Sequence, residues 1–326
     1  MSIVILTSKV GYGTYIPAIY AYKSIKSTSL YCIEDLLSPN AVNEFNKKIE
    51  LATQNPRFAE ISSYLPDKLF DGARIVRYNN LLTKWKAMGV KKFICFSGKW
   101  NWLLNQYYHL CQNFQVVGIV MDCQPSSIWN AMISEAMYSL TIRKVFGENV
   151  LLLASFEAKH YQQRDNIAVC HGGGWSLLKQ DDTLLLRGLG FDKIRVLLSK
   201  DNLMEMQGVE LIRFFCDFKG DFPCIVNEDS NTNILHPSLK LIRDAQLVLS
   251  KPGGMALMDC IMSETPMVLD SITIGLHEEA NRKWALANGI AIELKDLTNE
   301  NIKNGLLPHI HSKIVSLKER SKLLIT

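Results

Sequence analysis

A glycine turn ahead of an apolar helical pattern carries the clearest chemical signal in this chain. The segment from Ala245 to Leu249 is a short apolar run, and Lys251-Pro252-Gly253-Gly254 interrupts it where the helical pattern begins. The first turn of a helix leaves backbone N–H groups unpaired and carries the positive end of the helix dipole. Because glycine lets a diphosphate approach the backbone closely, this turn predicts a phosphate site.

Asp259 follows five residues after Gly254 in the same predicted helix. A carboxylate one to two turns beyond a phosphate site can accept hydrogen bonds from ribose hydroxyls. A tight turn in an ordinary α/β domain, with Asp259 merely solvated, would explain the same residues without a ligand. The polar residues that follow, Thr265-Pro266 and 277–281, favour the ligand-binding interpretation.

Together, these residues resemble the donor-binding signature of GT-B glycosyltransferases. The resemblance is specific over roughly forty residues, from Ser250 through Asp259 and Thr265-Pro266 to Asn281. It is closest to the group that contains the N-acetylglucosaminyltransferase that makes lipid II and the monogalactosyldiacylglycerol synthases. It implies an α/β chain of the GT-B class: two facing Rossmann-like doubly wound domains with an interdomain cleft, the donor held by the second domain and the acceptor by the first.

The resemblance also implies a role for each donor-site residue. The glycine turn would hold the nucleotide diphosphate, Asp259 would hold the ribose, and a polar loop at 278–282 would contact sugar hydroxyls. The base would be held by backbone near Leu235 and His236, just before a predicted helix. The residues of this expected donor site are Leu235, Lys251, Gly253, Gly254, Met255, Asp259, His277, Glu278, Asn281 and Arg282.

A second glycine loop, His171-Gly172-Gly173-Gly174, follows the apolar run from Ile167 to Cys170. Consecutive glycines expose backbone amides without side-chain obstruction, so Gly172, Gly173 and Gly174 are expected to face the donor phosphates. A protonated His171 or His277 would help to neutralise a leaving diphosphate. A histidine packed beside a glycine turn is more often structural, and both interpretations stay open here.

The first glycine loop, Lys9-Val10-Gly11-Tyr12-Gly13-Thr14, follows the apolar run from Ser2 to Thr7. Members of the resembled family often place a histidine where this chain has Thr14. A threonine hydroxyl cannot act as a general base near neutral pH, because a base needs a pKa near the working pH. Gly11, Gly13 and Thr14 are therefore expected to orient a phosphate or a hydroxyl group.

Asp122 is the candidate general base. It follows the apolar run 116–121, at the expected carboxyl end of a parallel strand, where ligands bind to open α/β sheets. The resembled galactolipid synthases carry a comparable aspartate followed by an aromatic residue, as Trp129 follows here. An aspartate that begins the next helix would explain the same residue. Glu135 is the reserve candidate.

The length of 326 residues is sufficient for two domains that each bury a core. Apolar runs alternate with helical patterns, which predicts parallel sheets covered on both faces. A polar segment from Glu157 to Asn166 interrupts this alternation and is the candidate linker. We expect an acceptor-binding Rossmann-like domain at 1–160 and a nucleotide-sugar-binding one at 161–326. Strand–helix pairs expected in the first half include 74–78 with 79–88 and 92–97 with 100–111.

The cysteine and acidic residues argue against a metal site. The eight cysteines form no C-x-x-C pair, and several lie in apolar runs typical of buried, reduced thiols. No D-x-D triplet is present to clamp a metal-bound diphosphate. We therefore expect no metal and no cofactor, with a UDP-sugar as donor substrate. The apolar runs are too short to span a bilayer and no signal-peptide pattern is present, which predicts a cytoplasmic protein.

The first hundred residues are basic, with fourteen Lys and Arg against seven Asp and Glu in a chain of net charge +4. Basic surfaces attract phosphates or anionic membranes. Trp85, Trp100 and Trp102 lie beside lysines in the sequence, which raises peripheral membrane contact as one interpretation. The other interpretation is a solvated basic face above core tryptophans. No nucleic-acid partner is expected.

The sequence thus predicts a metal-independent GT-B hexosyltransferase. It would move a sugar from a nucleoside-diphosphate donor, UDP in the resembled group, to a hydroxyl of a small-molecule or lipid-linked acceptor. A nucleotide-sugar hydrolase or epimerase would use the same donor loops, and a catalytically silent partner subunit would explain Thr14. A nicotinamide-dependent dehydrogenase is disfavoured, because neither glycine loop reads G-x-G-x-x-G with an acid about twenty residues on.

Overall fold

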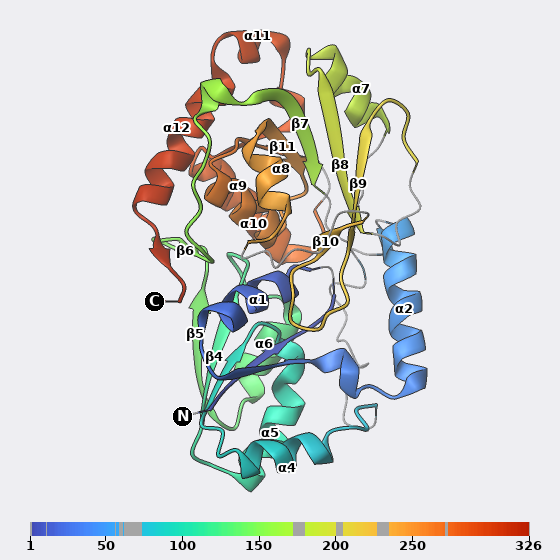
Figure 1. Cartoon of the computed structure of the whole chain (residues 1–326), viewed down its shortest axis with the longest axis vertical. Helices are drawn as coiled ribbons and strands as arrows, with labels where there is room; N and C mark the ends of the chain where they lie inside the picture. Colours follow the sequence, from blue (N-terminus) through green and yellow to red (C-terminus); the bar gives the residue numbers. More distant parts are fainter. Residues whose placement is uncertain are drawn as a thin grey trace. The chain divides into compact units, whose positions relative to one another are not determined.

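Two compact units make up the chain, one formed mainly by residues 1–145 and the other mainly by residues 146–324 (Figure 1). The computed structural model describes residues 2–10, 12–55, 57–58, 61, 74–171, 180–199, 205–226, 235–270 and 273–325. In these ranges each unit contains a largely parallel sheet whose strands are connected through helices. This is the α/β class that the alternating apolar and helical patterns predict.

The first unit follows the predicted alternation of strands and helices. The sequence-based strand at 74–78 is wrong, because Ile75 makes a single antiparallel bridge to Leu37 and no strand forms there. In chain order its elements are β1 (Ile3–Thr7), α1 (Tyr15–Ser24), β2 (Thr28–Cys32), η1 (Ile33–Leu36), α2 (Pro39–Gln54), α4 (Asn79–Ala87), β3 (Lys92–Cys95), η3 (Gly98–Trp100), α5 (Asn101–Leu110), β4 (Gln115–Val120), α6 (Ser127–Glu135) and β5 (Ser139–Lys144).

The five-stranded sheet of the first unit has the order β2-β1-β3-β4-β5, and all neighbouring strands are parallel. The strand order reverses between β1 and β3. Loops at the carboxyl ends of two such strands diverge, which is why ligands of open α/β sheets bind at this switch point. The loop after β1 contains the first predicted glycine loop, so its location agrees with a ligand-binding role.

Aromatic side chains fill one core cluster of the first unit. Trp85, Phe93 and Tyr107 are fully buried and meet edge-to-face, with ring centroids 4.9 Å to 5.7 Å apart. Trp129 packs over Gly118 of β4, where a Cβ would lie 2.8 Å from the indole ring. A larger residue at Gly118 would therefore displace Trp129 or the neighbouring strand.

The remainder of the chain forms the second alternation of strands and helices. Its elements are β6 (Leu151–Leu152), η4 (Tyr161–Gln163), β7 (Asp165–His171), α7 (Gln180–Gly188), β8 (Lys193–Ser199), β9 (Glu210–Phe215), β10 (Cys224–Ile225), α8 (Ser238–Arg243), β11 (Ala245–Ser250), α9 (Gly254–Ser263), β12 (Met267–Leu269), α10 (Gly275–Ala287), β13 (Ala291–Glu293), η5 (Leu294–Asp296), α11 (Asn299–Lys303), α12 (Leu306–Glu319) and β14 (Lys322–Leu323).

The seven-stranded sheet of the second unit has the order β10-β9-β8-β7-β11-β12-β13. Its neighbouring strands are parallel except for the antiparallel edge strand β10. Without that edge strand, the order is the one typical of dinucleotide-binding Rossmann folds. The switch point lies between β7 and β11, the two strands that precede the predicted glycine loops.

Helix α9 is held at its carboxyl end by two cationic side chains. Arg164 donates to the carbonyl oxygens of Ser263 (2.8 Å) and Glu264 (3.1 Å), and Lys318 donates to Met262 O (2.8 Å). Burial lowers the pKa of Arg164 to about 10, so it stays charged at neutral pH. Both cations complement the negative end of the helix dipole. Residues 157–166, the candidate linker, thus lie within the second unit, where Arg164 anchors them to α9.

All eight cysteines are free thiols. Burial raises the pKa of Cys95 to about 12 and raises that of Cys170 as well, so both stay protonated at neutral pH. A protonated, buried thiol is neither a nucleophile nor a metal ligand. These cysteines are therefore packing residues, as their apolar sequence context predicts.

Candidate functional site

The glycine turn lies where the sequence predicts it, between the end of β11 and the start of α9. Gly253 is the N-cap residue of α9, and among the described residues no side-chain cap hydrogen bond is made at this end of the helix. The first turn contains no acidic residue. A Cβ at Gly253 would meet one atom within 4 Å, Glu278 Oε1 at 3.8 Å. The helix N-terminus thus combines uncapped amide groups with positive electrostatic potential, the arrangement that binds phosphates.

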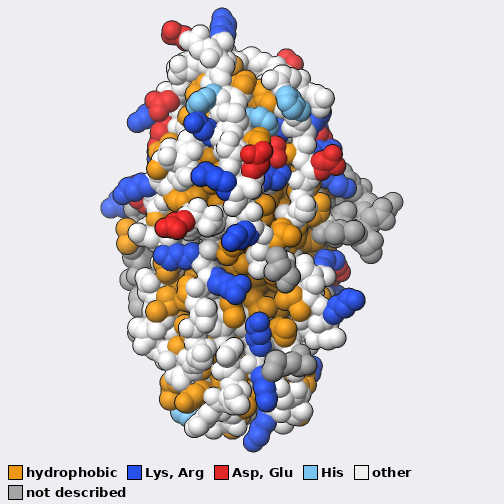
Figure 2. Space-filling model, turned by 90° about the vertical axis from the view of Figure 1, so that its left-hand side faces the viewer, with side chains coloured by type: hydrophobic (Ala, Val, Ile, Leu, Met, Phe, Trp, Pro, Cys, Tyr) orange, Lys and Arg blue, Asp and Glu red, His pale blue; other side chains and the backbone are white. Residues whose placement is uncertain are grey.

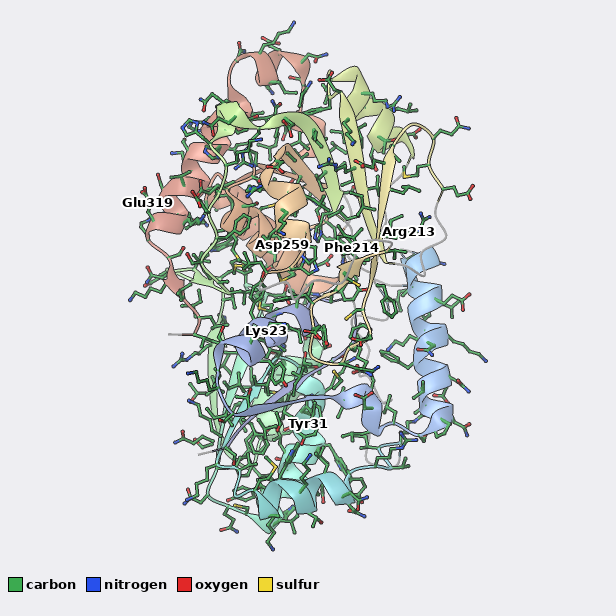
Figure 3. All side chains as sticks on the ribbon, viewed as in Figure 1. Lys23, Tyr31, Arg213, Phe214, Asp259 and Glu319 are labelled. Carbon is green, nitrogen blue, oxygen red and sulfur yellow. The ribbon has the colours of Figure 1, made fainter. Side chains whose placement is uncertain are left out.

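Asp259 lies on α9 (Figure 3) and is 1% exposed. Ser238 Oγ donates a hydrogen bond to Asp259 Oδ2 (3.3 Å), and His171 Nε2 lies 3.3 Å from the same oxygen. The other carboxylate oxygen, Oδ1, is buried and has no hydrogen-bond partner among the described residues. A buried polar atom without a partner is destabilising, and a hydrogen bond donated to this oxygen would remove that cost.

His236 contacts Ser238 and is neutral at neutral pH. Its ring stacks on Phe214 of β9 (centroids 5.6 Å apart), and its Nδ1 contacts Ser238 Oγ. Burial is the main cause that lowers the pKa of His236 to about 4, which outweighs the opposing attraction of Asp259. We name His171, His236, Ser238 and Asp259 the donor-side cluster. The sequence suggested Asp259, His171 and the neighbourhood of His236, but not Ser238.

Glu278 and Asn281 hold the glycine turn from helix α10. Glu278 Oε1 contacts Lys251 Nζ, and its Oε2 accepts a hydrogen bond from the Ile274 N–H (2.7 Å). Asn281 is fully buried and donates to Pro252 O (2.9 Å). These contacts fix the backbone that leads into α9. The predicted polar loop at 278–282 is wrong as secondary structure, because these residues form helical turns of α10.

Arg282 belongs to the same helix and forms a two-pronged ion pair with Glu293 at the end of β13. Its Nε donates to Glu293 Oε1 (2.8 Å), and its Nη2 contacts Oε2 of the same carboxylate. A paired guanidinium and carboxylate in this geometry has high directional specificity. The contact of Glu278, Asn281 and Arg282 with a donor sugar stays a prediction, and in the structure all three bind other parts of the chain.

The remaining donor-side predictions fall on partly buried positions. Leu235 and His277 are half-buried, and Met255 lies buried in the first turn of α9. Gly172, Gly173 and Gly174 lie outside the described residues. His171, which precedes them, lies at the carboxyl end of β7, and its Nε2 contacts Asp259 of α9. Its contact with a donor phosphate stays a prediction.

The first glycine loop is stabilised by its own side chains. Thr14 donates from Oγ1 to Ser8 O (3.0 Å), and Thr7 Oγ1 donates to Thr14 O (2.8 Å). Thr14 is the N-cap residue of α1, and a Cβ at Gly13 would meet no atom within 4 Å. Thr14 therefore shapes the loop, consistent with a residue that cannot act as a base. Gly11 lies outside the described residues.

A buried ion pair that the sequence did not suggest lies beside this loop. Glu34 and Lys99 approach to 3.7 Å, and their side chains are 7% and 9% exposed. Ser8 Oγ donates to Glu34 Oε1, and the Lys9 N–H donates to Oε2 (2.9 Å). We name Ser8, Glu34 and Lys99 the acceptor-side cluster. Ser8, Glu34 and Lys99 lie one, two and four residues beyond the ends of β1, β2 and β3, and this placement was the sole signal in the sequence.

Asp122 lies two residues beyond the end of β4 and is half-buried, at the sheet edge that the sequence predicts. Glu135, the reserve candidate, accepts a hydrogen bond from Asn101 Nδ2 (3.2 Å), and Asn101 in turn accepts one from the Tyr138 hydroxyl (3.1 Å). This network gives Glu135 a structural role. The role of Asp122 as base stays a prediction.

The tryptophans do not support membrane contact. Trp85 and Trp100 are fully buried, and Trp102 is packed against the same core. Figure 2 shows Lys and Arg side chains interspersed with hydrophobic and uncharged atoms on the face it displays. The alternative interpretation of core tryptophans is therefore correct. In the described part of the chain, no helix has the length and apolar character needed to cross a bilayer.

No cluster of three or more His, Cys, Asp or Glu side chains suited to a metal ion occurs among the described residues. The donor-side cluster contains two histidines and one carboxylate, and His236 directs its Nδ1 to Ser238 rather than to Asp259.

The chain resembles proteins of known structure in its fold. No protein-family model matches the sequence, and no curated protein matches it. SnogD, a glycosyltransferase from Streptomyces nogalater, superimposes with a TM-score of 0.56 at 11% identity, over 99% of this chain and 96% of that one. MurG from Acinetobacter baumannii gives 0.55 at 11% identity over 99% and 96%.

The glycosyltransferase VinC, solved in complex with dTDP, superimposes with a TM-score of 0.57 at 8% identity, over 98% of this chain and 95% of that one. The likeness thus covers both units and nearly the whole length of each known structure. At these identities it establishes the architecture, which is the one that the donor-site resemblance implies. The chain has the GT-B glycosyltransferase fold.

Proposed function

We propose that this protein is a glycosyltransferase whose second unit binds a nucleoside-diphosphate sugar. The observation that carries this proposal is the N-terminus of α9, which no described side chain caps, at the switch point of the sheet, with the buried carboxylate of Asp259 in the same helix. One helix thus offers a site for phosphates at its N-terminus and a carboxylate that can accept hydrogen bonds from ribose hydroxyls, which suits a nucleoside diphosphate. The fold supports it, because the neighbours include glycosyltransferases solved with dTDP and with an aglycone.

In this proposal the donor lies along α9. Backbone amides of Gly253, Gly254 and Met255 bind the diphosphate, Asp259 accepts hydrogen bonds from the ribose, and the backbone near Leu235 holds the base. UDP is the proposed nucleotide, on the residues that resemble the lipid II-forming group. Glu278 and Asn281 contribute first by fixing the turn, because both contact the backbone around it.

The reaction we propose is displacement at the anomeric carbon. Asp122 takes the proton of an acceptor hydroxyl as its oxygen forms a bond to that carbon, and the bond to the diphosphate oxygen breaks. The negative charge that develops on the diphosphate is stabilised by the amides and the dipole of α9. The helix supplies the electrostatic stabilisation, so the proposal includes no metal ion.

Calorimetric titration with UDP and with dTDP tests the donor site. The wild-type protein should bind UDP, and Asp259→Ala should weaken that binding by about 1.5–3 kcal/mol, the loss of a charge-assisted hydrogen-bond pair. Lys283→Ala, on the exposed side of α10, is the control and should bind as the wild type does. Failure of the wild-type protein to bind any nucleoside diphosphate would refute the proposal.

Incubation with a panel of nucleotide sugars tests the reaction class. Transfer to a hydroxyl in acceptor-containing extracts supports the transferase. Release of sugar without any acceptor identifies a hydrolase, and binding without turnover identifies a silent partner subunit.

Once an acceptor is identified, the turnover of Asp122→Asn can be measured. It should be about 10²–10⁴-fold lower than that of the wild type at nearly unchanged UDP affinity, because a general base typically accelerates a reaction by that factor. Turnover near the wild-type rate would remove Asp122 from the mechanism.

A further inference from the structure

We propose that Ser238 is a positioning residue that makes the donor site selective for the hydroxyls of a ribose. It acts through Asp259, by holding one carboxylate oxygen so that the other is presented to the ligand. This inference rests on the proposed function, because it assigns a specificity to the same nucleoside-diphosphate site.

Three segments of the chain converge on Asp259. Ser238 begins α8, just before β11, and Asp259 lies on α9, just after β11. His171 ends β7, which pairs directly with β11. Ser238 and Asp259 are each 1% exposed. The cluster therefore sits at the switch point of the sheet, where ligands of open α/β sheets bind.

The hydroxyl proton of Ser238 determines the direction of the hydrogen bonds. Ser238 has one hydroxyl hydrogen, which it donates to Asp259 Oδ2. In its contact with His236 Nδ1, Ser238 Oγ must then accept, so the neutral imidazole of His236 carries its proton on Nδ1. The two hydrogen bonds thus run in one direction, from His236 to Ser238 and from Ser238 to Asp259, and each donor orients the side chain that accepts from it.

The two oxygens of Asp259 are used unequally. Oδ2 is contacted by both Ser238 Oγ and His171 Nε2, each at 3.3 Å, whereas Oδ1 has no hydrogen-bond partner in the described part of the structure. Two contacts on one oxygen restrict rotation of the carboxylate. A ribose hydroxyl that donates to Oδ1 would satisfy the remaining buried acceptor, and the deoxyribose that lacks this hydroxyl would leave it unsatisfied.

The test compares UDP with its 2′-deoxy and 3′-deoxy analogues by calorimetry, and uses inorganic pyrophosphate as a probe of the α9 N-terminus. The wild-type protein should bind UDP at least about tenfold more tightly than one of the deoxy analogues. Ser238→Ala should reduce that ratio to about threefold or less, with unchanged pyrophosphate affinity. Ser312→Ala, which removes an exposed hydroxyl on α12, should keep the wild-type ratio.

A double-mutant cycle separates positioning from general weakening. In an Asp259→Asn background, Ser238→Ala should cause no further loss of the ratio, because Ser238 acts through that carboxylate. Ser238→Cys, a weaker donor of similar volume, reports the same ratio if the alanine variant is unstable.

Two failures are distinguishable. A wild-type protein that binds no UDP refutes the proposed function itself. A protein that binds UDP, loses ribose selectivity in Asp259→Asn and retains it fully in the Ser238 variants overturns the positioning role alone.

Discussion

The two units each place a buried polar cluster at the switch point of a parallel sheet, but the two clusters are completed differently. In the acceptor-side cluster, both oxygens of the Glu34 carboxylate accept hydrogen bonds from the protein, and Lys99 supplies the opposite charge. In the donor-side cluster, one oxygen of Asp259 has two contacts and the other has none among the described residues.

The difference separates a role in shape from a role in binding. A fully satisfied buried ion pair fixes the backbone around it, and removing one partner leaves an uncompensated charge. Glu34 does this for the loop after β1, through Ser8 and the Lys9 N–H. A carboxylate with a remaining acceptor atom instead retains free energy that a ligand can recover. In this comparison the first cluster stabilises the fold, and the second has the oxygen that the proposed donor would bind.

The largest expected effect is on stability when the acceptor-side ion pair is broken. Glu34→Gln removes the negative charge that faces the buried Lys99 ammonium, so the free energy of unfolding should fall by about 3–5 kcal/mol. Glu34→Gln/Lys99→Met removes both charges and should recover part of that loss. Urea unfolding of the single and double variants measures both values.

A matched control for this prediction is Glu279→Gln, which breaks the exposed pair of Glu279 with Lys283 on α10. Exposed pairs of this spacing contribute about 0.3–0.5 kcal/mol. If Glu34→Gln is no more destabilising than Glu279→Gln, the acceptor-side cluster does not hold its loop in the way proposed.

A smaller effect is expected from pH, and it arises in the donor-side cluster. Burial lowers the pKa of His236 from its ordinary value of 6.5 to about 4. Between these values the unfolded chain binds a proton that the folded protein excludes, so the free energy of unfolding falls as pH falls. Over that window His236 contributes a loss of about 3 kcal/mol.

Urea unfolding at several pH values between 7 and 4 measures this loss. His236→Gln should flatten the pH dependence by that amount, whereas His109→Gln, at an exposed position, should leave it unchanged. Equal slopes for the wild type and His236→Gln would show that His236 is not held neutral by burial.

The local sequence pattern was sufficient to predict β11 and α9, the strand and the helix on either side of the glycine turn. The apolar run ending at Leu249 and the glycines at 253 and 254 predict a buried strand and a helix start, and β11 and α9 form there. These signals succeed because burial of a parallel strand and glycine at a close turn each constrain residue type locally.

Prediction from local pattern failed where polar residues are buried. Glu278 and Asn281 are 4% and 0% exposed and hold the turn before α9, yet their polarity suggested a loop instead of helix α10. β5 was also missed, because most of its residues are exposed and it lacks a buried apolar run. Polar residues are exposed to solvent only on average, and those that form hydrogen bonds inside the protein are buried.

The acceptor-side cluster shows a further limit. Ser8, Glu34 and Lys99 are brought together by parallel pairing of three strands, across sequence separations that no motif spans. Asp259 could be proposed from the sequence because it follows the glycine turn within a few residues. Ser238 was missed because its hydrogen bond to Asp259 depends on α8 packing beside α9.

The smallest expected effect on stability comes from Asp259→Asn, the counterpart of Glu34→Gln in the other unit. The substitution keeps the shape of the side chain but removes a buried charge that has contacts on one oxygen only in the described structure. Loss of the His171 and Ser238 contacts is offset by relief of the desolvation penalty, so the free energy of unfolding should change by less than about 1 kcal/mol. UDP affinity, measured on the same preparation, should nevertheless fall at least about tenfold. A loss of stability as large as that of Glu34→Gln would mean that the Asp259 carboxylate is already satisfied within the protein, and the contrast between a shape-holding and a ligand-binding cluster would no longer stand.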